Sequence, residues 1–156
     1  IVMRLVGSEM CIRDRCLGNI CRSPLAEGIF RQLSHPSTYI IDSAGTANYH
    51  TGASPDRRSI AVASKNGLDI SGQKARQLTR NDLDDFDHIL VMDEQNRRDA
   101  LALCSNQTQR NKIELLTAAS GHDTTHIPDP YYGGEEGFET VFDLVSSCCN
   151  AWLAKH

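Results

Sequence analysis

The chain has 156 residues, of which 40% are hydrophobic and 23% are charged, and its formal net charge at pH 7 is −4. This length suits a single domain with one hydrophobic core. The negative charge and the lack of a basic stripe argue against nucleic acid as a partner. No apolar run approaches the ~18 residues of a membrane span, and we expect neither a membrane partner nor a signal peptide.

The six cysteines are spread unevenly, with a long gap between Cys21 and Cys104. Secreted disulfide frameworks are usually denser and occur in shorter chains. The sequence contains no C-x-x-C pair, which argues against a structural zinc site. We therefore expect a reduced protein in the cytoplasm.

Helix-like and strand-like patterns alternate along the chain. This order predicts an α/β domain with a parallel sheet, whose active site should lie at the carboxyl ends of the strands. The predicted elements, in chain order, are a helix over Pro24–Leu33, a strand over Thr38–Asp42, a helix over Pro55–Asn66, a strand over His88–Met92, a helix over Glu94–Cys104, a strand over Lys112–Leu116 and a helix over Gly137–Lys155.

The strongest chemical pattern is the run CLGNICRSP, from Cys16 to Pro24, which precedes the first predicted helix. A loop that enters a helix N-terminus presents backbone N–H groups and a positive dipole end to an anion. The same field lowers the pKa of a cysteine. We therefore predict a phosphate-binding loop with Cys16 as a thiolate nucleophile.

The other residue types in this run suit the same role. Gly18 and Asn19 tolerate the positive φ values that turn successive amides inward. Arg22 offers a planar fork that can hold two phosphate oxygens. Ser23 is expected to be the N-cap of the helix and to donate to the sulfur, with Pro24 as the first helical residue.

The C-x5-R spacing alone is weak evidence, because Cys104 and Arg110 share it. That second copy, CSNQTQR, has no glycine and follows a helical pattern. We interpret it as a cysteine at a helix end and a surface arginine.

The segment CLGNICRSPLAEGIF resembles the signature of the low-molecular-weight protein tyrosine phosphatases, and the resemblance runs from Cys16 to near the end of the chain. It implies a four-stranded parallel sheet with helices on both faces. It also implies hydrolysis of phosphotyrosine-type aryl phosphomonoesters through a phosphocysteine intermediate, with no cofactor and no metal. Phosphotyrosine-containing proteins would be the substrates, and a monomer is the expected state. Further matching blocks are Asp42–Thr46, Ser54–Arg58, Ala75–Gln77, Met92–Glu94 and Asp129–Tyr132.

The resemblance also implies roles for individual residues. Cys16 would be the nucleophile and Arg22 the phosphate clamp. Asp129, the aspartate of the D-P motif, would be the general acid, although the sequence alone favours a solvated loop aspartate there. The remaining phosphate-binding residues would be Leu17, Gly18, Asn19, Ile20, Cys21 and Ser23.

Aromatic residues would form the walls of the substrate pocket. By the same resemblance Tyr131 flanks the substrate ring, Tyr49 forms the opposite wall, Tyr132 contributes beside them and Leu17 lines the floor. Such walls suit a flat phenyl leaving group. The resemblance further implies that Cys21 can form a disulfide with the nucleophile on oxidation.

The first fifteen residues depart from the family pattern, which has an apolar strand directly before the nucleophile. Here Arg13, Asp14 and Arg15 occupy that place, and Ile1–Val6 is the better strand candidate. The run VGSEMCIRDR also resembles translated sequencing adaptor. We interpret residues 1–15 as an anomalous segment, a candidate sequence artefact, and residues 16–156 as the phosphatase domain.

Two other functions stay open on the sequence. An arsenate reductase on the same fold would need two relay cysteines around Gln77–Asn96, where there are none. A catalytically silent phosphate-binding module would not need the full set of catalytic residues.

His122 and His126 are spaced as in some metal sites, but the segment around them does not match H-E-x-x-H. We interpret this segment as a solvated loop.

Overall fold

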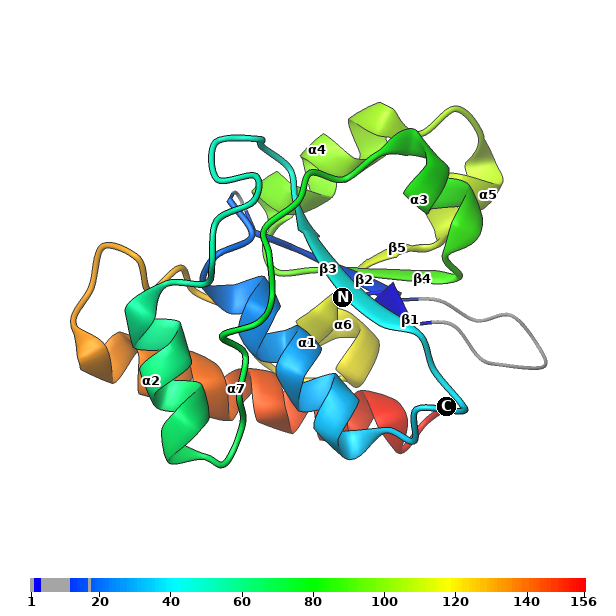
Figure 1. The fold of residues 1–156 in the computed structure, drawn as a ribbon. Helices are drawn as coiled ribbons and strands as arrows, with labels where there is room; N and C mark the ends of the chain where they lie inside the picture. The colour runs from blue at the N-terminus through cyan, green and yellow to red at the C-terminus, as the bar shows by residue number, and fades with distance from the viewer. Residues whose placement is uncertain (1, 4–11, 17) are drawn as a thin grey trace.

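The computed structural model describes residues 2–3, 12–16 and 18–156, with side chains from residue 18 onward. A central sheet lies between two layers of helices (Figure 1). The strands are β1 (Val2–Met3), β2 (Ile12–Cys16), β3 (Ile41–Gly45), β4 (His88–Val91) and β5 (Ile113–Leu115). The helices are α1 (Arg22–Leu33), α2 (Arg57–Lys65), α3 (Arg80–Asp85), α4 (Glu94–Leu103), α5 (Gln107–Asn111), α6 (Leu116–Ser120) and α7 (Glu135–Leu153).

The strand order is β1-β3-β2-β4-β5. Parallel pairings join β2 to β3, β2 to β4, and β4 to β5. The two-residue strand β1 pairs antiparallel with β3 and β4. The expectation of a single α/β domain is confirmed. The sheet differs from the expected parallel one in its additional antiparallel strand.

The residues just before the predicted nucleophile form the middle of the sheet. β2 pairs with β3 on one side and with β4 on the other. The sequence Ile-Arg-Asp-Arg-Cys therefore forms the central strand that leads into the phosphate loop. Of the candidate strand Ile1–Val6, the described residues Val2 and Met3 form β1. The proposed division between residues 15 and 16 stays a prediction.

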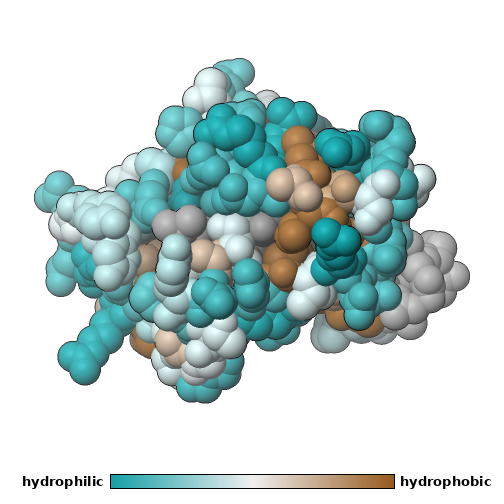
Figure 2. All heavy atoms as spheres, turned by 90° about the horizontal axis from the view of Figure 1, so that it is seen from above, coloured by the Kyte–Doolittle hydropathy of each residue, from teal (hydrophilic) through white to brown (hydrophobic). Residues whose placement is uncertain are grey.

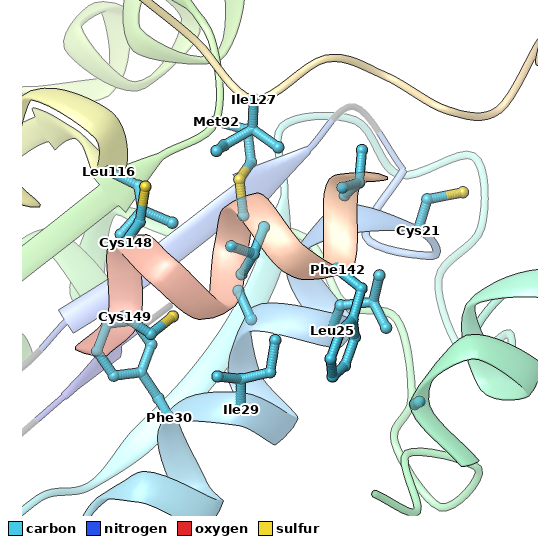
Figure 3. Packing of buried hydrophobic residues seen from close by; sticks show 14 of the residues in the cluster. Cys21, Leu25, Ile29, Phe30, Met92, Leu116, Ile127, Phe142, Cys148 and Cys149 are labelled. Carbon is cyan, nitrogen blue, oxygen red and sulfur yellow. The ribbon is translucent and has the colours of Figure 1, made fainter. Parts of the chain in front are cut away.

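The larger hydrophobic core lies between the sheet and the layer that contains α1, α2, α6 and α7 (Figure 1). Trp152 of α7 is 1% exposed, and its ring meets Phe30 at 5.9 Å and His88 at 5.3 Å between centroids. Burial lowers the pKa of His88 to about 4, so this imidazole is neutral at pH 7 and packs as an aromatic ring. Cys148 and Cys149 lie at one end of this core and Cys21 at the other (Figure 3).

A smaller core lies on the opposite face of the sheet, beneath α3 and α4. It contains Leu83, Ile89 and Val91, all fully buried. Figure 2 shows this face from above: hydrophilic side chains cover most of it, and hydrophobic ones show in a narrow area near the middle. Within the described part of the chain, no helix combines the length and apolarity needed to cross a membrane.

Several element boundaries differ from the predicted ones. β3 begins at Ile41 rather than Thr38, because Thr38 and Tyr39 donate backbone hydrogen bonds to the His35 carbonyl in a turn. The first helix begins at Arg22, and α7 begins at Glu135, before Gly137.

The acidic segment Asn81–Asp87 contributes to α3 and, through Leu83, to the smaller core. Asp82 is 7% exposed. It forms a capping box with Thr79 and an ion pair with Arg76 at 3.2 Å. The capping box and the ion pair compensate the buried charge of the Asp82 carboxylate. The ion pair is a tertiary contact, which a local sequence pattern cannot predict.

The central position of β2 makes its charged sequence testable. An unpaired charge in a doubly covered strand costs several kcal/mol against a total stability of about 5–15 kcal/mol. We expect a chain in which a short Met-start and an apolar V-L-F-V-type strand replace residues 1–15 to melt at a higher temperature, by about 2–4 °C per kcal/mol gained.

The matched control has the same shortened start but keeps the Arg-Asp-Arg sequence before Cys16. Calorimetry on the three chains checks the prediction. Equal melting temperatures would show that the charged strand is a natural, compensated feature.

Candidate active site

The phosphate loop begins where β2 ends. Cys16 is the last residue of β2, and its backbone pairs with Gly45 of β3. The Cys16 side chain and all of Leu17 lie outside the described part, so the roles predicted for them stay predictions. From Gly18 the chain turns into α1. The loop thus lies at the carboxyl end of a central parallel strand, as the sequence predicts.

Asn19 supplies the left-handed turn of the loop, with φ of 54°. Asparagine tolerates this conformation better than most residues. The φ of Gly18 depends on Leu17, which lies outside the described residues, so the tolerance of a positive φ expected there stays a prediction. A Cβ at Gly18 would lie 2.5 Å from Cδ2 of His50, so the His50 ring would have to move to admit it.

A chain of hydrogen bonds braces the loop against β3 and α1. Nδ2 of Asn19 donates to the Ser43 carbonyl at 3.3 Å, and the Ser43 hydroxyl donates to Glu27 at 2.5 Å. Glu27 also pairs with Arg31 at 2.8 Å. Burial raises the pKa of Glu27, while these two partners oppose the rise. A buried carboxyl group, that of Glu27, therefore lies at the base of the hydrogen bonds that join Asn19 and Ser43.

The prediction that Ser23 is the N-cap of the first helix is wrong. The N-cap of α1 is Cys21, which makes no side-chain cap, and the helix begins at Arg22. Pro24 then falls within the first turn, where its missing N–H removes no helical hydrogen bond. The Ser23 hydroxyl is buried and has no hydrogen-bond partner among residues 18–156. It remains available as a donor at the loop.

The guanidinium of Arg22 is buried, with 2% of the side chain exposed. Its Nη1 donates to Asp93 at 2.8 Å and to the Ile127 carbonyl at 2.7 Å. Its Nη2 lies 3.8 Å from Oδ2 of Asp129. Nε has no partner in the part of the chain whose side chains are described. We define residues 128–134 as the acid loop. Arg22 thus links the phosphate loop to the acid loop, and among the described residues its Nε–H is left free to donate to another group.

Asp93 is a site residue that the sequence analysis missed. One of its oxygens accepts from Arg22, and the other accepts from the backbone N–H of Asn96 and caps α4. The block Met92–Glu94 was visible as a family match, but its function depends on this contact between distant segments.

Asp129 is accessible to a substrate, because 42% of its side chain is exposed. Its Oδ1 accepts from the backbone N–H of Tyr131 at 3.0 Å, which fixes the carboxylate to its own loop. Pro130 between them is buried. The acid loop is thus anchored, and its carboxylate faces the mouth of the site.

A cleft of about 340 Å³ brings most of the predicted pocket together. Tyr49 and Tyr132 are highly exposed, at 77% and 92%, and Tyr131 is 41% exposed. The rings of Tyr131 and Tyr132 meet edge to face at 5.1 Å. His50 is the second residue that the sequence analysis missed, although it directly follows Tyr49. The cleft is lined by Gly18, Ile20, Cys21, Tyr49, His50, Asp129, Tyr131 and Tyr132.

Comparison with known proteins identifies the family of this chain. The family model described as "Low molecular weight phosphotyrosine protein phosphatase" matches residues 15–156. The chain belongs to this family. The protein of that name from Gallus gallus is 46% identical over 146 residues, which cover 90% of this chain and 91% of that protein.

Two solved structures show the same fold. A protein tyrosine phosphatase from Entamoeba histolytica with Hepes in its active site aligns with a TM-score of 0.85 at 37% identity, covering 92% of this chain and 94% of that one. Wzb from Vibrio vulnificus, in complex with benzylphosphonate, aligns with a TM-score of 0.83 at 31% identity, covering 93% and 97%. This low molecular weight phosphatase is an enzyme of the protein-tyrosine-phosphatase class.

Membership of this family favours a phosphatase over the arsenate reductase that the sequence left open. The second C-x5-R copy forms no loop of this kind: Cys104 ends α4, Arg110 lies exposed in α5, and the Cys104 thiol donates to the Ala100 carbonyl. Over residues 18–156, no group of three His, Cys, Asp or Glu side chains is arranged to hold a metal, and this range includes His122 and His126.

The contact between Gly18 and His50 yields a prediction for the phosphatase. Gly18→Ala is expected to displace the His50 ring from the cleft and to lower kcat/KM by about tenfold, because overpacking costs about 1–3 kcal/mol. In a His50→Ala background the same substitution should cost less than about twofold, since the obstructing ring is gone.

The four variants of this double-mutant cycle are compared by kcat/KM for an aryl phosphate. A tenfold loss that persists without the His50 ring would place the requirement for glycine in the loop backbone instead.

Proposed function

We propose that this phosphatase hydrolyses phosphotyrosine-type aryl phosphomonoesters through a phosphocysteine intermediate on Cys16. One observation carries the proposal. Nη2 of the buried Arg22 lies 3.8 Å from Asp129, Asp129 lines the cleft with tyrosine walls, and Arg22 follows the loop after the strand that Cys16 ends. An anion site, a proton donor and a place for an aromatic ring are thus adjacent.

Phosphate would bind in the loop between β2 and α1. Its oxygens would accept from backbone N–H groups of the loop residues and from Nε of Arg22, the donor that lacks a described partner. The Ser23 hydroxyl, also without a described partner, would donate to the Cys16 sulfur. The phosphate-binding residues of the proposal are Leu17, Gly18, Asn19, Ile20, Cys21 and Ser23.

The reaction would take two steps. In the first, the Cys16 thiolate attacks phosphorus, the S–P bond forms as the P–O bond to the phenol breaks, and protonated Asp129 gives its proton to the leaving oxygen. In the second, the Asp129 carboxylate takes a proton from water, whose oxygen bonds to phosphorus while the S–P bond breaks. Phosphate leaves, and Asp129 and Cys16 return to their starting states.

The walls of the cleft support an aryl substrate. Tyr49 and Tyr131, with Tyr132 beside them, offer flat surfaces to a phenyl ring. The related Wzb binds benzylphosphonate, a phenyl group attached through carbon to a phosphonate. Phosphotyrosine residues on proteins are the substrates we propose, in the cytoplasm, and the residues of the site carry out the steps above without a cofactor.

The nucleophile is tested by Cys16→Ser. Turnover of para-nitrophenyl phosphate should fall below detection, while binding of inorganic phosphate stays within about threefold, because the backbone donors and Arg22 are unchanged. Cys104→Ser, from the second C-x5-R copy, is the matched control and should keep full activity. The reverse pattern would overturn the assignment. If both variants kept full turnover, neither Cys16 nor Cys104 would be the nucleophile.

The acid is tested by Asp129→Asn. For phenyl phosphate, kcat/KM should fall by about 10²–10⁴-fold, because the leaving oxygen needs a proton. The loss should shrink for aryl phosphates whose leaving groups are stable as anions. Asp123→Asn, at an exposed aspartate of the preceding segment, is the control. The same loss across all leaving groups would assign Asp129 another role.

A further inference from the structure

Arg58, in the first turn of α2, makes contacts that the steps above do not use. Its Nη1 donates to the Gly133 carbonyl and its Nη2 to the Tyr131 carbonyl, both at 3.2 Å. Both acceptors belong to the acid loop. A side chain of α2 therefore holds the backbone of the loop that carries Asp129.

The guanidinium of Arg58 is itself held in place. Asp56, the N-cap of α2, accepts from its Nε and Nη2 at 3.0 Å each, in a two-point contact. These hydrogen bonds lower the pKa of Asp56. The guanidinium carbon also lies 4.5 Å from the ring centre of Phe138 in α7 and 5.6 Å from that of Tyr131. A planar fork with several fixed donors can satisfy all these partners at once, which an ammonium group cannot.

The same end of α2 contacts the phosphate loop. The backbone N–H of Asp56 donates to the Ile20 carbonyl at 2.7 Å, and the Ser59 hydroxyl donates to the Cys21 carbonyl at 3.3 Å. The start of α2 thus has one set of contacts with the phosphate loop and, through Arg58, another with the acid loop. These contacts set the distance between the two loops.

We propose that Arg58 is a positioning residue, which holds Asp129, through the backbone of Tyr131, at the correct distance from the phosphate loop. The path is short: Arg58 fixes the Tyr131 carbonyl, and the Tyr131 N–H holds the Asp129 carboxylate. The proposal rests on the proposed role of Asp129 as the acid. It predicts that losing Arg58 impairs proton donation while phosphate binding persists.

The test compares Arg58→Met and Arg58→Lys with the parent enzyme. For phenyl phosphate, kcat/KM should fall about tenfold in Arg58→Met, because a small displacement of a catalytic group is costly. For an aryl phosphate with an anion-stable leaving group the loss should be less than about threefold, since that reaction needs no proton. Arg58→Lys should recover only part of the loss. Inhibition by inorganic phosphate should change by less than about twofold, because Asp56 and Ser59 keep their contacts with the phosphate loop.

Arg57→Met is the matched control, because Arg57 is the adjacent arginine, is exposed and makes no side-chain hydrogen bond with residues 18–156. It should behave like the parent. Circular dichroism and melting temperature establish that each variant folds. If Arg58→Met does not fold, Asp56→Asn provides the test: it weakens the support of Arg58, keeps a capping side chain, and should give a smaller loss with the same leaving-group pattern.

The decisive measurement adds Arg58→Met to Asp129→Asn. With the acid already removed, the second substitution should cost less than about twofold. Additive losses, or a loss in Arg58→Met that is equal for all leaving groups, would overturn the positioning role, as would no loss. If Asp129→Asn alone shows no leaving-group dependence, the acid assignment itself fails, and that outcome is distinct from a failure of Arg58.

Discussion

Burial of the Arg22 guanidinium is the constraint on which the rest of the site depends. An arginine side chain stays charged inside a protein, and an isolated buried charge is expensive. Asp93 and the Ile127 carbonyl supply close partners on one side. They follow β4 and α6 in the chain, so satisfying one cation at the start of α1 requires three distant segments to meet. The fold and the proposed anion site are therefore built by the same contacts.

The partners of Arg22 are supported in turn by the backbone around them. Asp93 uses its second oxygen to cap α4, which orients the carboxylate and places a negative charge at a helix N-terminus. The N–H of Ile127 donates to the Met92 carbonyl at 2.8 Å, which ties the segment before the acid loop to the end of β4. Met92 and Ile127 also lie close together in the large core (Figure 3). The polar site thus rests directly on hydrophobic packing.

The sequence predicted those parts of the fold and site that local patterns encode. The apolar runs at β4 and β5 gave nearly correct boundaries, because short buried strands leave a clear signal. Residue type and order predict the loop from Cys16 to Arg22, whereas Asp129 is singled out only by the resemblance to the family. β3 and α3 were misplaced or missed, because a turn at His35 and the capped, ion-paired Asp82 override local propensity. Asp93, His50 and Arg58 acquire their roles from tertiary contacts, which no window of sequence contains.

The two walls of the cleft come from different parts of the chain than its floor. Tyr49 and His50 belong to the connection after β3, whereas Tyr131 and Tyr132 belong to the acid loop. Neither pair lies in the segment that we propose binds phosphate. Exposed loop residues tolerate substitution better than buried ones do. Substrate preference and bond cleavage are therefore separable traits in this architecture. Natural divergence or a focused mutant library can reshape the surroundings of the scissile group at Tyr49, His50 and Tyr132 while the buried machinery around Arg22 stays intact.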